Sequence, residues 1–406
     1  MKIVIVGAGH AGGSAAALLR ASGFEGSILL VGAEPVPPYQ RPPLSKAWLK
    51  GEVDLDAVLL RPQEFYAEQS IDLRTSLKAV SIDRAAKTVE LSDGSTEAYD
   101  ALILATGSVG RRLTLPGSDT ADLLELRTLE DAERLKARLT SGSRLAIVGG
   151  GYVGLEAAAS ARALGAEVVV LERMDRVLAR VASETLSAFF TDRHRREGVD
   201  IRTGVEVTGF EPGGVRLADG ETIPADVILV GIGALADTDL AEAAGLDCTR
   251  EGSGGIVVDE QARTSDPAIF AIGDATWRPV PVHGRRMRLE SVPNALEQAR
   301  QAAHAIVGRA PPAPEVPWFW SDQYDLKLQI AGVAHGADRA VVRGDVEAGR
   351  FAVFHLHEGR LVCVEAVNAP AEFMAGRQLI ARAARPDPAA LADPAQPMKA
   401  IAATSA

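Results

Sequence analysis

The chain has 406 residues, enough for about two to four domains, and its 47% hydrophobic and 24% charged residues are typical of a folded protein. A formal net charge of −11 excludes non-specific nucleic-acid binding, which needs a basic face. Two distant cysteines, Cys248 and Cys363, exclude a disulfide framework and a thiolate metal cage. Neither a membrane-spanning apolar run nor a signal peptide is recognisable, so we expect a cytoplasmic protein without a membrane partner.

The chain begins with a strand–turn–helix–strand pattern that is typical of a parallel sheet. Residues 2–6 form an apolar run, residues 13–22 are rich in alanine, and residues 27–31 form a second apolar run. The pattern recurs about 142 residues later. Its second copy comprises a strand at 144–148, a turn at 149–154, a helix at 155–164 and a strand at 167–171.

Three glycines occupy matching positions in the two turns. They are Gly7, Gly9 and Gly12 in the first turn, and Gly149, Gly151 and Gly154 in the second. In a dinucleotide-binding turn the first glycine permits the tight turn, the second lets the backbone approach the pyrophosphate, and the third allows close packing of helix and strand. The sequence therefore predicts two dinucleotide sites.

An acidic residue follows each second strand, where a carboxylate accepts hydrogen bonds from a ribose diol. Glu34 is the candidate in the first repeat, with an ordinary surface carboxylate as the alternative. Glu172 is the candidate in the second repeat and favours NADH, because it repels the 2′-phosphate of NADPH. The adjacent Arg173 is able to bind that phosphate, which weakens the preference.

Three more apolar strands are predicted, at 101–107, 227–233 and 268–274. The last ends at Asp274, and ligands of open α/β sheets lie beyond the carboxyl ends of strands, so Asp274 is placed to face one. After a proline-rich break at 310–314, alternating residues predict a small antiparallel β region, and we expect the last twenty residues to be loosely held.

The predicted fold class is α/β, with two Rossmann-like dinucleotide-binding domains, one inserted in the other, and a small α+β C-terminal domain. Two dinucleotide sites in one chain indicate a flavin that takes hydride from a nicotinamide. The expected boundaries are residues 1–112 with 245–310 for an FAD-binding domain, 113–244 for an NAD-binding domain, and 311–406 for the C-terminal domain.

Several further motifs carry a family resemblance. They are Ala105-Thr106-Gly107, Gly273-Asp274, Arg41-Pro42-Pro43-Leu44-Ser45-Lys46, Arg127-Thr128-Leu129-Glu130-Asp131-Ala132, Glu290-Ser291-Val292-Pro293-Asn294-Ala295 and Trp318-Phe319-Trp320-Ser321-Asp322-Gln323. Together with the paired glycine turns, they resemble the flavoproteins related to glutathione reductase, and within these the FAD-dependent NADH:ferredoxin reductases that serve bacterial oxygenases. The resemblance extends from Met1 to about Asp393.

The resemblance implies FAD and NADH as cofactors. It places Glu34 near the ribose of FAD, Ala79 at the adenine, Arg127 at the pyrophosphate, Asp274 at the ribityl chain, Val292 at the edge of the flavin ring, and Lys46 at the isoalloxazine. The full set of candidate FAD ligands is Gly7, Gly9, Ala11, Gly12, Glu34, Arg41, Lys46, Ala79, Ala105, Thr106, Gly107, Arg127, Asp274 and Val292. The candidate NAD ligands are Gly149, Gly151, Tyr152, Gly154, Glu172 and Gly231.

Lys46, Glu156 and Trp320 are the candidate catalytic residues. A cation near the flavin stabilises its reduced anion, although Lys46 is otherwise an exposed lysine at a helix start after two prolines. Glu156 either pairs with Lys46 or is a surface acid of its helix. Trp320 is expected near the flavin, whereas Trp318 and Phe319 are equally well explained as domain core. His355 and His357 lack a third ligand at metal spacing, so we expect no metal site.

No thiol occurs between residues 37 and 46, where related disulfide reductases place their redox cysteines. We therefore expect electrons to pass from the flavin directly to an acidic 2Fe–2S ferredoxin that docks transiently. The protein itself is expected to be a monomer or a weak dimer. Basic clusters are either solvated surface or the docking site; they comprise Arg285, Arg286 and Arg288, Arg111 and Arg112, with Arg61 and Arg300 as further candidates. The alternatives are a rubredoxin reductase, an NADH oxidase without a protein partner, and a flavin-bearing signalling protein.

Overall fold

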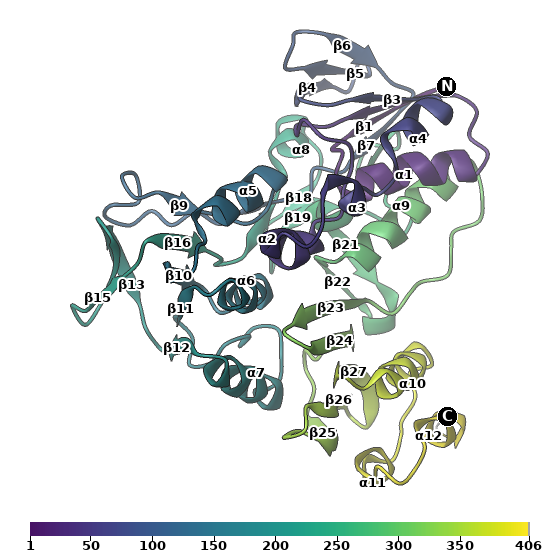
Figure 1. The fold of residues 1–406 in the computed structure, drawn as a ribbon. Helices are drawn as coiled ribbons and strands as arrows, with labels where there is room; N and C mark the ends of the chain where they lie inside the picture. The colour runs from purple at the N-terminus through teal and green to yellow at the C-terminus, as the bar shows by residue number, and fades with distance from the viewer. Residues whose placement is uncertain (405–406) are drawn as a thin grey trace. The chain divides into compact units, whose positions relative to one another are not determined.

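The computed structural model describes residues 1–404. The chain forms two compact units, each assembled from three segments (Figure 1). Unit 1 consists of residues 1–40, 55–109 and 235–317, and unit 2 consists of residues 41–54, 110–234 and everything from residue 318 onward. Among the described residues, no helix has the length and apolar character needed to cross a bilayer.

Unit 1 is built on a five-stranded parallel sheet. Its strands, in spatial order, are β20 (Ile269–Ala271), β7 (Ala101–Leu104), β1 (Lys2–Val6), β2 (Ser27–Val31) and β3 (Ile71–Arg74). Helices α1 (His10–Ala21) and α9 (Val292–Ile306) lie side by side in Figure 1. Fully buried alanines line both helices, including Ala15 and Ala302, and their small side chains allow this close approach.

The remaining elements of unit 1 are short. One antiparallel sheet consists of β4 (Ala79–Asp83), β5 (Thr88–Leu91) and β6 (Thr96–Ala98). A second small sheet consists of β18 (Cys248–Thr249), β19 (Gly255–Val257), β21 (Thr276–Val280) and β22 (Arg285–Met287). The helices are α3 (Leu55–Val58), α4 (Gln63–Glu68), α8 (Asp239–Ala243), η2 (Gly273–Ala275) and η3 (Pro281–His283). The chain passes from one unit to the other through β8 (Ser108–Gly110) and β17 (Ala234–Ala236).

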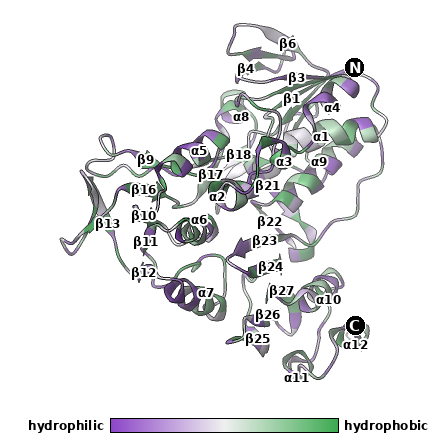
Figure 2. Ribbon diagram, in the orientation of Figure 1, coloured by the Kyte–Doolittle hydropathy of each residue, from purple (hydrophilic) through white to green (hydrophobic). Residues whose placement is uncertain are grey.

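Unit 2 repeats the parallel architecture of unit 1. Its strands, in spatial order, are β12 (Val199–Thr203), β11 (Glu167–Glu172), β10 (Arg144–Val148), β16 (Val227–Val230) and β9 (Leu123–Leu124). The helices are η1 (Pro42–Ser45), α2 (Ala47–Lys50), α5 (Leu129–Arg138), α6 (Tyr152–Ala163) and α7 (Glu184–Arg196), and a small antiparallel sheet consists of β13 (Val207–Glu211), β14 (Gly214–Leu217) and β15 (Thr222–Pro224). Figure 2 shows α6 as largely hydrophobic and α7 as largely hydrophilic, in keeping with the deep burial of α6.

The C-terminal part of unit 2 is an antiparallel sheet followed by three helices. The strands, in spatial order, are β23 (Trp318–Gln323), β24 (Leu326–Gly332), β27 (Arg360–Val367), β26 (Arg350–His357) and β25 (Arg339–Asp345). The helices are α10 (Pro370–Ala381), α11 (Pro388–Ala392) and α12 (Met398–Thr404). The antiparallel β region predicted from alternating residues is therefore present.

The expectation of a loosely held C-terminus is wrong for residues 387–404. Leu391 and Ile401 are buried, at 0% and 3% exposure. The buried guanidinium of Arg343 donates to backbone carbonyls of this segment, at 2.6 Å from Asp393 and 2.8 Å from Gln396. The composition of the segment did not indicate that it is held in place, because the hydrogen bonds that hold it come from Arg343, which is distant in sequence. Residues 405 and 406 lie outside the described part of the chain.

Both nucleotide-turn helices begin three residues earlier than predicted. The expected starts were residues 13 and 155, whereas α1 begins at His10 and α6 at Tyr152. The physical reason is that each third glycine, Gly12 or Gly154, is a helical residue of the first turn and does not belong to the loop.

Candidate functional site

The first glycine turn, in unit 1, has no room for side chains at two of its three glycines. Gly7 has φ +107°, and a Cβ there would lie 2.2 Å from the carbonyl oxygen of Ala105. A Cβ on Gly12 would lie 1.9 Å from the carbonyl oxygen of Gly7. Around Gly9, by contrast, a Cβ would meet nothing within 4 Å, so the backbone is open to an approaching ligand.

The second turn, in unit 2, repeats this geometry. Gly149 has φ +111°, and a Cβ there would lie 2.4 Å from the carbonyl oxygen of Gly231. A Cβ on Gly154 would lie 2.5 Å from the carbonyl oxygen of Gly149, while Gly151 again has open space. Gly231 therefore occupies in unit 2 the place of Ala105 in unit 1.

Both turns fit a pyrophosphate. Each helix has a glycine at its N-cap, Gly9 for α1 and Gly151 for α6, and no acidic residue in its first turn. The N-terminal N–H groups of such a helix are unsatisfied within the helix, and their dipoles attract negative charge. The two helix starts are thus suited to one dinucleotide each.

The two predicted ribose acids have different partners. The carboxylate of Glu172 accepts hydrogen bonds from the backbone N–H groups of Gly150, at 2.7 Å, and Met174, at 2.8 Å. These hydrogen bonds hold the Glu172 carboxylate at the second turn, where it would bind a ribose diol. The carboxylate of Glu34 accepts a hydrogen bond from the hydroxyl of Tyr39 at 2.6 Å.

Strand β4 begins next to the segment that carries Glu34. The backbone N–H of Ser76 donates to the carbonyl of Glu34, and that of Leu77 donates to the carbonyl of Gly32. Ala79, the first residue of β4, follows two residues later. The predicted adenine and ribose contacts thus come from adjoining backbone.

The strand end at Gly273 and Asp274 adjoins the first glycine turn. A Cβ on Gly273 would lie 3.0 Å from the Cβ of Ala11. The hydroxyl of Ser108 donates to the carboxylate of Asp274 at 3.3 Å. Ser108 follows the Ala105-Thr106-Gly107 motif directly, so the structure brings that motif and Asp274 together.

Two of the motif residues also anchor a neighbouring loop of unit 1. The hydroxyl of Thr106 donates to the carbonyl of Asp237 at 2.7 Å, and the backbone N–H of Asp237 donates to the carbonyl of Gly107 at 3.0 Å.

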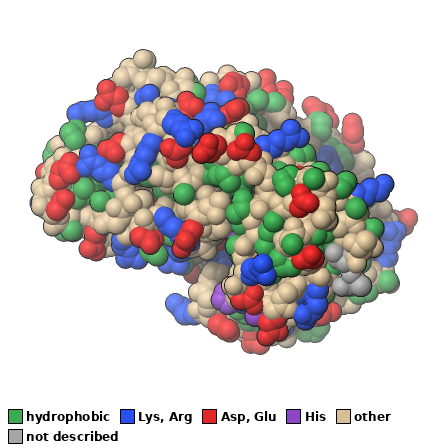
Figure 3. All heavy atoms as spheres, turned by 90° about the horizontal axis from the view of Figure 1, so that it is seen from below, with side chains coloured by type: hydrophobic (Ala, Val, Ile, Leu, Met, Phe, Trp, Pro, Cys, Tyr) green, Lys and Arg blue, Asp and Glu red, His purple; other side chains and the backbone are tan. Residues whose placement is uncertain are grey.

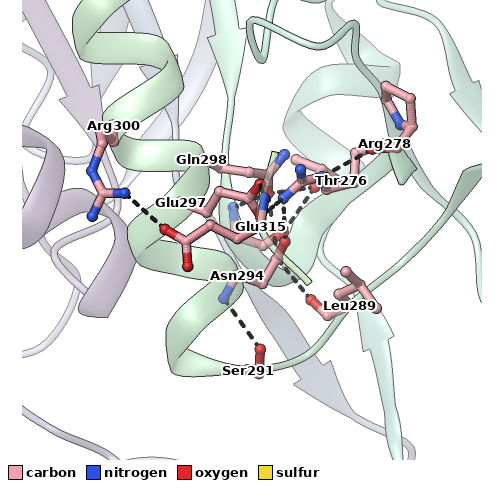
Figure 4. Close-up of polar contacts among 11 residues, drawn as sticks. Thr276, Arg278, Leu289, Ser291, Asn294, Glu297, Gln298, Arg300 and Glu315 are labelled. Atoms are coloured by element: carbon pink, nitrogen blue, oxygen red, sulfur yellow. Dashed lines mark hydrogen bonds and ion pairs between the residues drawn. The ribbon is translucent and has the colours of Figure 1, made fainter. Parts of the chain in front are cut away.

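A buried polar cluster in unit 1 supports this strand end, and sequence reasoning missed it. The side-chain oxygen of Gln298 accepts hydrogen bonds from the backbone N–H of Gly273 at 2.8 Å and the hydroxyl of Thr276 at 2.9 Å. The guanidinium of Arg278 donates to Asn294 at 2.9 Å and to Glu297 at 2.7 Å. Figure 4 draws the polar contacts of this cluster. Gln298 and Asn294 lie on α9, whose first residue is the predicted flavin contact Val292. The polar residues within the mostly apolar helix α9 were the sequence signal that could have indicated this cluster.

Lys46 and Glu156 form an ion pair within unit 2. Their charged atoms are 2.5 Å apart, and the side chains are 19% and 6% exposed. The same carboxylate accepts hydrogen bonds from the hydroxyls of Ser45 and Ser321, each at 2.6 Å. The predicted pairing is therefore confirmed, and the alternative of a surface acid is wrong for Glu156. The catalytic role of the pair stays a prediction.

The aromatic residues of β23 divide between its two faces. Phe319 packs edge-on against Tyr152, with ring centroids 4.9 Å apart, and Trp318 packs against Phe373 at 5.7 Å. The interpretation of Trp318 and Phe319 as packing residues agrees with these contacts. Trp320 is half-buried, and its ring centroid lies 5.7 Å from that of Trp318.

Three candidate FAD ligands, Arg41, Lys46 and Arg127, belong to unit 2, whereas the others belong to unit 1. The guanidinium of Arg41 donates to the backbone carbonyl of Arg127. The backbone N–H of Arg127 in turn donates to the carboxylate of Asp131 at 3.1 Å, just before α5 begins. These two predicted ligands therefore lie together.

The two histidines considered as a metal pair stand two residues apart on β26. They differ in exposure, because His355 is buried within the strand whereas His357 is the exposed last residue of β26. Within residues 1–404, no cluster of three or more His, Cys, Asp or Glu side chains has an arrangement that holds a metal ion.

Residues 1–299 match the family described as pyridine nucleotide-disulphide oxidoreductase, and residues 318–402 match the family described as reductase C-terminal. The chain belongs to the pyridine nucleotide-disulphide oxidoreductase family. It is therefore an oxidoreductase, and the two glycine turns fit its cofactors, FAD and NAD(H).

Within this family the chain is similar to reductases of small electron carriers. It is 50% identical to the probable ferredoxin reductase CtmF of Castellaniella defragrans, over 99% of this chain and 98% of the relative. A rubredoxin-NAD(+) reductase of Pseudomonas putida is 41% identical, over 91% of this chain and 96% of the relative. In the crystal structure of a covalent putidaredoxin reductase–putidaredoxin complex, one chain aligns with a TM-score of 0.96 and 42% identity, over 100% of this chain and 98% of that one.

Proposed function

We propose that the protein is an FAD-dependent NADH:ferredoxin oxidoreductase, which passes electrons from NADH through FAD to a 2Fe–2S ferredoxin that serves an oxygenase. The observation that carries this proposal is the presence of two dinucleotide turns without an activated thiol. Burial raises the pKa of Cys248 to about 11 and raises that of Cys363 well above its ordinary value. Since a redox thiol acts as its thiolate, neither cysteine is suited to receive electrons.

The two turns divide the cofactors between them. The first turn, with Ala11 and Asp274, holds FAD, and the second turn holds NADH, with Glu172 on its ribose. When bound, FAD supplies a centre that accepts hydride from NADH and gives up electrons one at a time. The Lys46 ammonium, held by Glu156, would supply positive charge to the flavin.

An acidic ferredoxin that docks transiently is the proposed partner. Arg285 and Arg286 are exposed on β22, whereas Arg288 pairs with Glu290 and has a side chain only 3% exposed, so it is not part of a docking surface. On the face drawn in Figure 3, basic and acidic side chains are interspersed, which favours local contacts over one large basic patch. A cytoplasmic location and a monomeric or weakly dimeric state stay predictions.

The test is NADH-driven reduction of cytochrome c by the purified flavoprotein, with and without added carriers. Strong stimulation by a 2Fe–2S ferredoxin is the expected result. Stimulation by a rubredoxin alone would establish the second candidate, a rubredoxin reductase, which the 41% identity to such an enzyme favours. Rapid NADH consumption that no carrier alters, with formation of peroxide, would overturn both and indicate an NADH oxidase.

A further inference from the structure

A chain of buried polar side chains leads away from Glu156 within unit 2. The hydroxyl of Ser321 lies 2.6 Å from one carboxylate oxygen of Glu156, and the amide nitrogen of Gln323 lies 3.1 Å from the oxygen of Ser321. The amide oxygen of Gln323 lies 2.8 Å from Nε2 of His194, and the hydroxyl of Tyr324 lies 2.9 Å from Nδ1 of His194. Four hydrogen bonds therefore connect Glu156 with Tyr324.

Three separate elements build this chain. Ser321 and Gln323 stand two residues apart on β23 and so point to the same face of the sheet. Glu156 lies on α6 and His194 on α7. Ser321 and His194 have no exposed surface and Gln323 is 1% exposed. Polar groups buried this deeply are costly unless each is paired, so the pairing determines how every one of them is oriented.

The carboxylate fixes the direction of the whole chain. Glu156 is paired with Lys46 and, as an ion, only accepts hydrogen bonds. The single hydroxyl proton of Ser321 is therefore donated to Glu156, and Ser321 must accept its other bond from the amide N–H of Gln323.

The amide oxygen of Gln323 then faces His194, so His194 carries its proton on Nε2. Its Nδ1 accepts a hydrogen bond from the hydroxyl of Tyr324. Each donor in the chain thus points toward Glu156.

We propose that Ser321, Gln323 and His194 are positioning residues for the Lys46–Glu156 pair. The aligned donors hold one carboxylate oxygen of Glu156, and the other oxygen therefore stays directed at the Lys46 ammonium. Burial lowers the pKa of His194 to about 4, which keeps the imidazole neutral at pH 7. The structural part of this inference stands alone, and its consequence for flavin reduction rests on the proposed function.

The direction of the chain is testable by NMR of ¹⁵N-histidine-labelled protein, with the His194 signals assigned by their loss in a His194→Gln variant. At pH 7 we expect His194 neutral and protonated on Nε2. In Glu156→Gln the new amide N–H donates to Ser321, the chain reverses, and His194 becomes protonated on Nδ1. The signals of His355, a buried histidine paired with Glu365 instead, should not change. Protonation on Nδ1 in the native protein, or on Nε2 in both proteins, would overturn the proposal.

The consequence for the reaction is testable by breaking the chain at Ser321. Ser321→Ala should slow flavin reduction by NADH about tenfold, the effect of losing one hydrogen bond to a charged group, while the Kd for NADH changes less than twofold. Ser321→Thr keeps the hydroxyl and should restore the rate. Ser187→Ala is the matched control, because Ser187 is an equally buried serine of unit 2 outside the chain.

Equal rates in the Ser321→Ala and Ser187→Ala variants would show that Ser321 only fills space and would overturn the positioning role. A Lys46→Ala variant separates the two proposals. If it reduces its flavin normally while the NMR result holds, the role of Lys46 in the proposed function fails and the directed chain stands.

Discussion

The two glycine turns have nearly the same backbone and differ in what is attached to it. In both, the first glycine has a left-handed φ and lies against the neighbouring strand end, Ala105 in one unit and Gly231 in the other. The turns differ in the acidic side chains around them. Glu172 is bonded to its own turn, whereas Glu34 is bonded to Tyr39, and only the second helix carries a buried acid, Glu156, two residues after its last turn glycine.

This contrast distinguishes the backbone, which is suited to bind a pyrophosphate, from the side chains, which differ between the two sites. The backbone geometry serves any pyrophosphate, because it offers only N–H groups and space. The side chains decide which dinucleotide is preferred and what happens to it. The corresponding position in α1, Ser14, has no charge, so only the helix start of unit 2 carries a buried acidic side chain.

The largest expected effect comes from replacing Gly12, the turn glycine with the least space for a Cβ. Gly12→Ala places a Cβ 1.9 Å from the carbonyl of Gly7, whereas Gly154→Ala leaves 2.5 Å to the carbonyl of Gly149. We expect Gly12→Ala to lower the free energy of unfolding by about 3 kcal/mol and to abolish FAD retention, and Gly154→Ala to cost about half as much and retain FAD. Denaturant unfolding and flavin content after purification measure both. Equal losses in the two variants would mean that the turns are not distinguished by packing.

The next effect is a pH dependence that belongs to unit 2. The pKa of His194 is lowered to about 4, mainly by burial, from an ordinary value of 6.5. The unfolded chain therefore binds a proton between these values that the folded chain does not, and stability falls as the pH drops from 6.5 to 4, by about 3 kcal/mol from this group. Urea unfolding of the native protein and of His194→Gln should show this loss in the native protein alone. Parallel pH profiles would contradict it.

Replacement of the two predicted ribose-binding residues, Glu172 and Glu34, should affect different cofactors. Glu172→Gln removes the charge that repels a 2′-phosphate, so we expect the KM for NADH to rise about tenfold and the preference for NADH over NADPH to narrow. Glu34→Gln should leave both nicotinamide constants unchanged and weaken FAD retention. Steady-state ferricyanide reduction with each nucleotide measures the first effect, and flavin content the second. An unchanged nucleotide preference in Glu172→Gln would remove its assigned role.

The smallest effect on stability is expected at the middle glycines. Gly9 and Gly151 have negative φ, and a Cβ at either meets nothing within 4 Å. Alanine at either position should therefore change the free energy of unfolding by less than about 1 kcal/mol. Binding should still weaken, of FAD for Gly9→Ala and of NADH for Gly151→Ala, because the Cβ occupies the ligand's approach. Calorimetry and NADH titration test this, and undiminished binding would argue against a pyrophosphate at that turn.

Much of the fold was predictable because its signals are local. Glycine spacing and apolar runs located β1, β2, β10 and β11 with little error, since a turn and its flanking strands lie within thirty residues of each other. The contacts between Gln323 and His194, and between Arg343 and the C-terminal segment, were not predictable. Each joins residues far apart in sequence by a hydrogen bond that no local spacing specifies.

The discontinuity of unit 1 has a consequence during synthesis on the ribosome. Strand β7 ends at Leu104, but its sheet neighbour β20 begins only at Ile269, after most of unit 2's nucleotide-binding segment. At about 5–20 residues per second, the emerging chain waits on the order of ten seconds or more with one side of β7 unpaired. An open strand edge invites pairing with other chains. The nascent chain is therefore expected to be most prone to aggregation in that interval. Lower growth temperatures or additional chaperones should raise the yield of folded protein.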